Sequence, residues 1–189
     1  MIFEFGVLNY KSMPNDDCAE VLLSGRSNAG KSSALNALAE NRKLARTSKT
    51  PGRTTEINLF RVNEDLRLLD LPGYGFAKSD KSKKKDWGPM LGEYFQKRNS
   101  LKAVVIFMDI RHPLKETDID MIGLCRDFEI EFLPVLTKSD KVSNNETFKA
   151  KQVVQKKTGV KEVLTISALK NLGIKELRNH LINYSLKDE

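Results

Sequence analysis

Short apolar runs alternate with amphipathic stretches along most of the chain. The apolar runs predict six strands, at Glu20–Ser24, Glu56–Val62, Leu66–Leu71, Leu101–Ile110, Glu131–Leu136 and Glu162–Ile166. Stretches with apolar residues three or four positions apart predict helices at Lys31–Glu40, Lys84–Lys97, Glu116–Asp127, Glu146–Lys157 and Ile174–Tyr184. This alternation is typical of an α/β fold with a mostly parallel six-stranded sheet and helices on both faces.

The tripeptide Asn63-Glu64-Asp65 favours a turn, so the second and third predicted strands are expected to form an antiparallel hairpin at the sheet edge. The chain has no internal repeat and no long linker rich in Pro, Gly or Ser. A length of 189 residues suits one domain with a sizeable core. We therefore predict a single domain, with residues 1–18 as an N-terminal extension and residues 19–189 as its core.

Composition narrows the class of protein. The two cysteines, Cys18 and Cys125, are far apart, so reduced thiols and a cytoplasmic location are expected. No apolar run approaches the roughly 20 residues that a membrane span needs. The net charge of +7 and the pI near 9.3 favour polyanion partners such as RNA or the ribosome. The alternative explanation of the charge is a solvated basic surface.

The most informative motif is G-x-x-x-x-G-K-S, which lies between a predicted strand and a predicted helix. Glycines let the backbone wrap around phosphates, and the helix N-terminus adds its positive dipole end. We expect Lys31 to bridge the β- and γ-phosphates and the Ser32 hydroxyl to bind Mg²⁺. The predicted phosphate-binding residues are Gly25, Arg26, Ser27, Asn28, Ala29, Gly30, Lys31 and Ser32.

A second motif, Asp70-Leu71-Pro72-Gly73, follows a predicted strand. A carboxylate at that strand end would hold Mg²⁺ through water, and the Gly73 N–H would bond the γ-phosphate. All four residues, Asp70, Leu71, Pro72 and Gly73, are therefore assigned to nucleotide binding.

A third motif, Thr137-Lys138-Ser139-Asp140, predicts recognition of guanine. The Asp140 carboxylate can accept hydrogen bonds from guanine N1–H and N2–H₂, a donor pair that adenine lacks. The Lys138 stem can pack over the base, and the Thr137 hydroxyl would do part of the tethering of the more usual asparagine. The predicted guanine-binding residues are Thr137, Lys138, Ser139 and Asp140, with Ile166, Ser167 and Ala168 near guanine O6.

The basic segment Asn41–Arg53 lacks apolar periodicity and is expected to form a loop. This loop and the residues just after it offer Thr47, Thr50, Thr54 and Thr55 to complete the Mg²⁺ site. Thr54 is the first choice because the stretch Pro51-Gly52-Arg53-Thr54 lies just before a predicted strand. Thr55 is the alternative. The nucleotide-binding residues assigned here are Gly52, Arg53, Thr54, Thr55 and Glu56, and the metal ligands are Ser32 and Thr54.

Together these motifs resemble the EngB family of bacterial GTPases. The resemblance rests on GRSNAGKSS, ARTSKTPGRT (Ala45–Thr54), DLPGYG (Asp70–Gly75), MDIRHP (Met108–Pro113) and TKSD, and spans about Ala19–Leu181. It implies a P-loop GTPase fold, Mg²⁺-dependent hydrolysis of GTP to GDP and phosphate, and a cytoplasmic location. It also implies a role in assembly of the large ribosomal subunit and in normal cell division and septation. Lys31, Thr54 and Gly73 are the expected catalytic residues.

Tyr74 stands where many GTPases have a glutamine that orients the attacking water. We therefore expect slow intrinsic hydrolysis that needs help from a partner, RNA or a cation. Asn28 occupies the position at which related GTPases hold K⁺, so a potassium ion is one candidate. Arg46 and Arg53 are candidate arginine fingers, although contact with RNA phosphates or solvent is the favoured interpretation.

Two other functions are weighed against a GTPase switch. One is a nucleotide-gated binding module in which ribosome binding is the function and hydrolysis is incidental. The other is a small-molecule P-loop kinase, which Thr137–Asp140 disfavours. The expected partners are GTP or GDP and the large ribosomal subunit with its RNA, with no membrane, no DNA and a monomeric chain. No zinc site is expected at His112 or His180.

Overall fold

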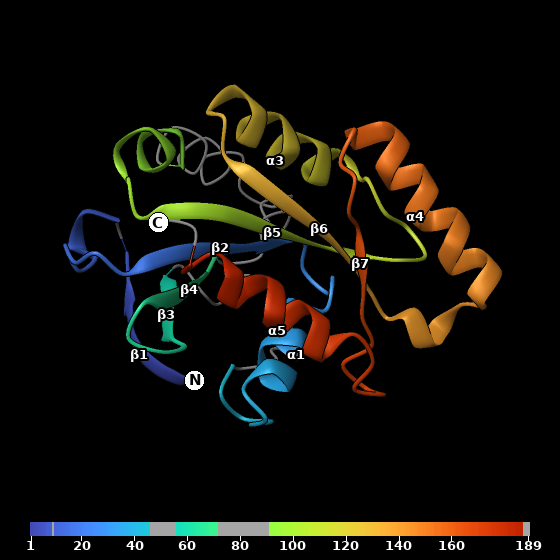
Figure 1. Cartoon of the computed structure of the whole chain (residues 1–189), viewed down its shortest axis with the longest axis horizontal. Coiled ribbons are helices and arrows are strands. Elements are labelled where there is room, and N and C mark those ends of the chain that lie inside the picture. Colours follow the sequence, from blue (N-terminus) through green and yellow to red (C-terminus); the bar gives the residue numbers. More distant parts are fainter. Residues whose placement is uncertain (9, 46–55, 72–90, 187–189) are drawn as a thin grey trace.

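The computed structural model describes residues 1–8, 10–45, 56–71 and 91–186. They form a seven-stranded sheet in the order β1-β3-β4-β2-β5-β6-β7 (Figure 1). The strands are β1 (Ile2–Val7), β2 (Ala19–Gly25), β3 (Ile57–Arg61), β4 (Leu66–Asp70), β5 (Leu101–Asp109), β6 (Glu131–Thr137) and β7 (Leu164–Thr165). The helices are α1 (Lys31–Leu38), α3 (Glu116–Asp127), α4 (Asn144–Thr158) and α5 (Ile174–Asn183), and residues 91–97 form a further helix.

The predicted α/β class is confirmed, and each of the six predicted strands is present with ends shifted by a few residues. Strands β4, β2, β5, β6 and β7 are mutually parallel, while β3 pairs antiparallel with β4 as expected from its turn. The helix predicted at Lys84–Lys97 begins outside the described residues, and positions 91–97 are helical.

The strand count of six is corrected to seven by β1, which lies within the predicted N-terminal extension. This strand pairs antiparallel with the free edge of β3, so β1 rather than β3 lies at the sheet edge. Backbone hydrogen bonds hold it, whereas Ile2, Phe3 and Phe5 remain exposed and only Val7 is buried. Because its side chains show no buried face, the sequence pattern did not reveal the strand.

The sheet is buried from both sides. On β2, Val21 and Leu23 belong to an apolar cluster beneath α1 and α5, and Leu22 belongs to the cluster on the α3 side. All seven residues of β2 are buried, as expected for a central parallel strand covered on both faces (Figure 1). Within the described residues, no helix has the length and apolar character to cross a membrane.

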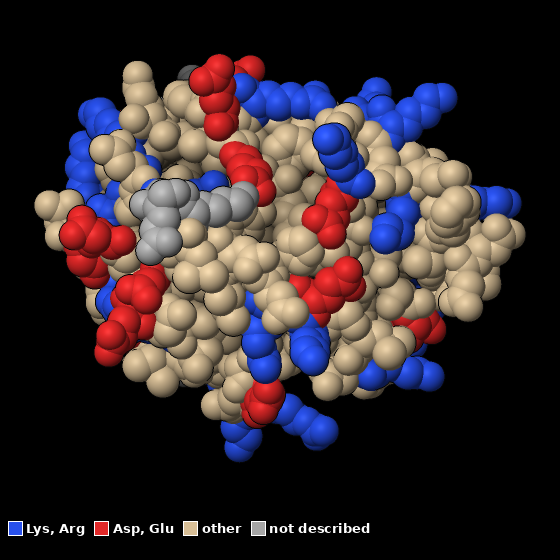
Figure 2. Space-filling model, in the orientation of Figure 1, with Lys and Arg blue, Asp and Glu red and all other residues tan. Residues whose placement is uncertain are grey.

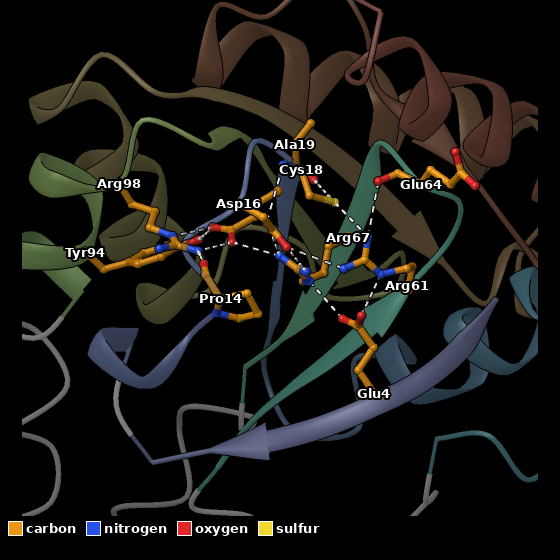
Figure 3. A network of polar contacts seen from close by, with 11 residues as sticks. Glu4, Pro14, Asp16, Cys18, Ala19, Arg61, Glu64, Arg67, Tyr94 and Arg98 are labelled. Atoms are coloured by element: carbon orange, nitrogen blue, oxygen red, sulfur yellow. Dashed lines mark hydrogen bonds and ion pairs between the residues drawn. The ribbon is translucent and has the colours of Figure 1, made fainter.

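A buried ionic network lies near the amino ends of β2 and β4 (Figure 3). The Arg67 side chain is 0% exposed and donates from Nε to Glu4 Oε2 at 2.8 Å and from Nη2 to Asp16 Oδ2 at 2.7 Å. Arg61 donates from Nε to the other Glu4 oxygen at 2.6 Å. The bond from Arg67 is the main cause that lowers the pKa of Asp16 to about 2. These charges attach β1 and the following segment to the core strands.

A third carboxylate, that of Glu20, extends the network toward the helix at 91–97. Glu20 is 0% exposed and accepts two hydrogen bonds from Arg98, from Nη2 at 2.7 Å and from Nε at 3.0 Å. The Tyr94 hydroxyl donates to the same carboxylate at 3.0 Å. Burial raises the pKa of Tyr94, so the phenol stays protonated and serves as a donor.

We expect Arg67→Met to lower the free energy of unfolding by about 3–5 kcal/mol, because Glu4 and Asp16 lose their buried partner. Arg61→Met is the control, since its side chain is 29% exposed and water can replace its contacts. Urea denaturation at neutral pH measures both variants. Equal losses of unfolding free energy in the two variants would contradict the prediction, because they would show that burial of Arg67 adds nothing to the cost of removing its charge.

Candidate nucleotide-binding site

The carboxyl ends of four parallel strands meet at one edge of the sheet. Gly25 ends β2, Asp70 ends β4, Asp109 ends β5 and Thr137 ends β6. Ligands of open α/β sheets bind at this edge, outside the carboxyl ends of the strands. The structure therefore brings three of the motifs together, although they are separated by tens of residues in sequence.

The phosphate-binding turn runs from Gly25 at the end of β2 to Lys31 at the start of α1. Two of its residues have left-handed backbone conformations, Asn28 with φ 63° and Gly30 with φ 90°. A Cβ at Gly30 would lie 3.1 Å from the Thr137 hydroxyl, so glycine also meets a steric need there. Ser32 lies half-buried in the first turn of α1, where free N–H groups and the helix dipole favour an anion.

Lys31 and Asp70 are in contact at the centre of the site. The Lys31 ammonium, 7% exposed, donates to the Asp70 carboxylate and to the Leu71 carbonyl. Burial raises the pKa of Asp70, and the neighbouring Lys31 charge opposes that effect. A carboxylate and a hydroxyl, here Asp70 and Ser32, are oxygen ligands of the kind that Mg²⁺ prefers, so the residues fit this ion.

Thr137 connects the phosphate-binding turn to the central strands. Thr137 is 3% exposed. Its hydroxyl oxygen lies 2.5 Å from the Ala29 carbonyl oxygen and 3.1 Å from the Met108 carbonyl oxygen. The single hydroxyl proton serves one carbonyl at a time. The hydroxyl thus connects the turn after β2 with β5, and its predicted tethering role in base binding stays a prediction.

Lys138 reaches from the guanine motif back to the phosphate-binding turn. Its backbone is left-handed, with φ 59°, and its ammonium donates to the Asn28 carbonyl at 2.7 Å and to Asp109 Oδ2 at 2.8 Å. With both ends held, the aliphatic stem of the lysine is available as an apolar surface for a base.

Asp140 is held by the loop that follows β7. Ser167 Oγ donates to Asp140 Oδ1 at 2.6 Å, and the Ser139 N–H donates to the Ile166 carbonyl at 3.1 Å. The Asp140 side chain is 5% exposed. The hydrogen bond from Ser167 is the main cause that lowers the pKa of Asp140, which keeps the carboxylate ionised and able to accept two donors.

For the other predicted site residues within the described part of the chain, the structure gives burial or a neighbour but no hydrogen bond to another motif. Arg26 is exposed, Ser27 and Ala168 are half-buried, and the Glu56 carboxylate lies beside Gly6 of β1. Pro72, Gly73, Gly52, Arg53, Thr54 and Thr55 lie outside the described residues, as do Tyr74 and Arg46.

The sequence argument did not assign a role to Asp109. This carboxylate accepts from Lys138 and also from Arg111, whose Nε lies 2.9 Å from Oδ1 and whose Nη2 lies 2.6 Å from Oδ2. The hydrogen bonds from Arg111, followed by those from Lys138, hold the pKa of Asp109 well below its usual range. An acidic residue at the end of the strand beside β2 is the signal that could have identified it.

A group of three possible metal ligands lies elsewhere. One ligand atom each from Glu162, Glu176 and His180 falls within 4.8 Å of the others. Glu176 precedes His180 by one helical turn of α5, so the expectation that His180 has no acidic partner at metal spacing is corrected. Exposed acidic groups are common without an ion, and His180 already pairs with Glu162 at 3.2 Å, so we assign no metal here.

Comparisons with known proteins agree with this geometry. Residues 20–138 match the family described as 50S ribosome-binding GTPase. A probable GTP-binding protein EngB of Pectobacterium carotovorum subsp. carotovorum is 48% identical over 178 residues, which cover 92% of this chain and 84% of the relative.

Solved structures share the fold. A crystal structure of a probable GTP-binding protein EngB superimposes with a TM-score of 0.72 at 21% identity, over 89% of this chain and 100% of that chain. A crystal structure of Era in complex with MgGDPNP and a segment of 16S ribosomal RNA gives a TM-score of 0.65 at 20% identity, over 89% and 57% of the two chains.

The fold and the motifs at its carboxyl edge define a P-loop GTPase. Within that class, the chain belongs to the EngB family.

We expect Asp109→Ala to weaken GDP and GTP equally, by about tenfold, because Lys138 loses a charge-assisted hydrogen bond at the base end of the site. Asp109→Asn, which keeps an acceptor oxygen, should lie between the alanine variant and wild type. Titration of a fluorescent GDP analogue, with unlabelled GTP as competitor, measures the affinities.

The control for this prediction is Asp127→Ala, an exposed carboxylate at the end of α3. A loss confined to GTP would contradict the assignment of Asp109, since its contact with Lys138 predicts a position at the base end of the site rather than near a γ-phosphate.

Proposed function

We propose that this chain binds GTP or GDP with Mg²⁺ at the carboxyl edge of its sheet, hydrolyses GTP, and uses the cycle to assist assembly of the large ribosomal subunit. Normal cell division and septation would depend on that assembly. The protein would act in the cytoplasm as a monomer, with neither DNA nor a membrane as partner.

The observation that carries this proposal is the convergence of four separate motifs with direct contacts between them. Lys31 at the start of α1 contacts Asp70 at the end of β4, and Thr137 contacts Ala29. Lys138 contacts Asn28 within the phosphate-binding turn. Ser167 contacts Asp140. A chance resemblance in one motif would not assemble all of these contacts at one edge.

Each residue has a definite task in the proposed reaction. Lys31 would neutralise charge on the β- and γ-phosphates, Ser32 would bind Mg²⁺ directly, and Asp70 would hold the ion through water. Thr54 and Gly73, which lie outside the described residues, would complete the metal site and sense the γ-phosphate. Mg²⁺ would supply further neutralisation of the phosphate charge.

Intrinsic hydrolysis should be slow because Tyr74 replaces the usual glutamine. A ribosomal partner or RNA is one source of the missing assistance. A K⁺ ion beside the exposed Asn28 is another, since an amide oxygen suits a hard cation and extra positive charge would stabilise the transition state.

The ribosomal part of the proposal is supported by charge and by family. The chain carries a net charge of +7, which favours binding to RNA phosphates. Its family is described as 50S ribosome-binding. Basic residues of the segment Asn41–Arg53, among them Arg42 and Lys43, would contribute to this contact.

We expect Mg²⁺-dependent GTP turnover to be slow alone and at least tenfold faster with isolated large ribosomal subunits. Lys31→Ala should abolish turnover and weaken both nucleotides, because the phosphates lose a buried cation. The same assay in K⁺ and in Na⁺ at equal ionic strength, with Asn28→Ala alongside, tests the ion. Turnover that subunits leave unchanged would favour a binding module over a catalytic switch.

We expect Asp140→Asn to weaken GTP by about 100-fold and to improve binding of xanthosine triphosphate. The new amide would lose an acceptor for guanine but could donate to the xanthine 2-oxygen. Competition binding of the two nucleotides measures the ratio, and Asp120→Asn on the exposed side of α3 is the control. An unchanged ratio would contradict the assignment of Asp140 to guanine.

A further inference from the structure

Helix α4 (Asn144–Thr158) is attached to the molecule by a narrow inner face. Its buried residues are Val154 and Thr158, with Ala150 packing partly against the apolar cluster. At about 100° per residue, the exposed positions Lys149, Gln152 and Lys156 lie opposite Val154, and the exposed Phe148 and Val153 lie on the two flanks of that side. We call these five residues the α4 outer face.

Two large apolar side chains lie exposed on the α4 outer face. Phe148 is 59% exposed and Val153 is 55% exposed. Single apolar residues at a surface are ordinary. Here, however, they flank two lysines on the outward half of the helix, and an aromatic ring beside cations is the combination that protein surfaces use for stacking on bases while holding phosphates.

The charged side chains of α4 are mostly positive. The helix carries Lys149, Lys151, Lys156 and Lys157 against a single acid, Glu146. Glu146 is engaged at the helix start, where its carboxylate accepts from the Ser143 N–H at 2.8 Å and from the Ser143 hydroxyl at 2.7 Å. Among the described residues, none of the four lysines forms a salt bridge.

Neighbouring elements add to this positive charge. Arg126 of α3 donates to the Thr158 carbonyl at 2.7 Å, which brings a guanidinium to the C-terminal end of α4. On the face drawn in Figure 2, basic and uncharged side chains make up most of the edge where α4 lies. The outer surface of the helix itself is therefore suited to a polyanion.

The spacing on the helix favours an extended anion over a point charge. Lys149 and Lys156 lie two turns apart on the same side, so their Cα atoms are about 10 Å apart along the helix axis. Phe148 offers an aromatic face near Lys149, and base stacking on such a face is tolerant of sequence. A membrane surface fits less well, because two large apolar residues separated by Gln152 give little area for insertion.

We propose that the α4 outer face binds RNA, with Lys149 and Lys156 on backbone phosphates and Phe148 stacked on an unpaired base. This inference rests on the proposed ribosomal role and names a surface for it. The helix begins at Asn144, shortly after Asp140 at the base end of the nucleotide site. Because guanine is common to GDP and GTP, binding through this face should not depend on which nucleotide is present.

The test uses Lys149→Gln/Lys156→Gln in the full chain, with two probes: a fluorescein-labelled RNA hairpin with an unpaired loop, and isolated large ribosomal subunits. Loss of two phosphate contacts should lower the slope of log affinity against log salt by about 1.4, at about 0.7 per contact on single-stranded RNA. Affinity for both probes should fall at least tenfold, equally with GDP and with a GTP analogue.

Two further variants separate base stacking from phosphate contact, and the charge of α4 from the general charge of the protein. Phe148→Ala should weaken binding to the hairpin at least fivefold without changing the salt slope, since stacking releases no counterions. Lys170→Gln/Lys175→Gln removes the same charge from exposed positions outside α4 and should have a much smaller effect on both probes. GDP affinity and thermal unfolding verify that every variant is folded.

The proposal is overturned if the α4 double variant and the Lys170/Lys175 variant lose the same affinity and slope. It is also overturned if anionic vesicles of phosphatidylglycerol bind the wild type through α4 more tightly than the hairpin does. If wild type binds the hairpin through α4 but never binds subunits, the ribosomal role fails while the RNA surface stands.

Discussion

The site depends on the close approach of the phosphate-binding turn to β6. Gly30 and Ala29 lie against Thr137, and a Cβ at Gly30 would sit only 3.1 Å from the threonine hydroxyl. This approach aligns the start of α1 with the strand ends, so that Lys31 meets Asp70 on β4. A bulkier residue at position 30 would face both a left-handed backbone and this contact, and it would displace the turn.

At the opposite end of the sheet, near the amino ends of β2 and β4, buried charges constrain how the chain can fold. Arg67 and Glu20 are both 0% exposed, and full desolvation of an unpaired charge would cost far more than folding can offset. Each has several partners drawn from separate segments, among them Glu4, Asp16 and Arg98. Such pairing makes the location of β1 and of the helix at 91–97 specific, because any other placement would leave a buried charge without its partner.

Sequence reasoning succeeded where local pattern carries the information. The turn before Lys31 and the strand ahead of Asp140 follow from apolar runs and turn residues that lie within about ten positions of each other. It failed where contacts are long-range. Strand β1 is held by backbone bonds to β3, and Asp109 receives Lys138 from 29 residues away, so neither leaves a periodic signal in the chain.

The Thr137–Asp140 segment connects the predicted guanine site to the phosphate-binding turn. Lys138 contacts the Asn28 carbonyl within the phosphate-binding turn, and Thr137 contacts the adjacent Ala29 carbonyl. Asp140, three residues further on, is oriented by Ser167. A displacement of this segment would therefore change the contacts expected at both the base and the phosphates of a bound nucleotide. Base specificity and phosphate affinity should be coupled in this protein, because the same short segment supports the two contacts through hydrogen bonds of 2.5–2.7 Å.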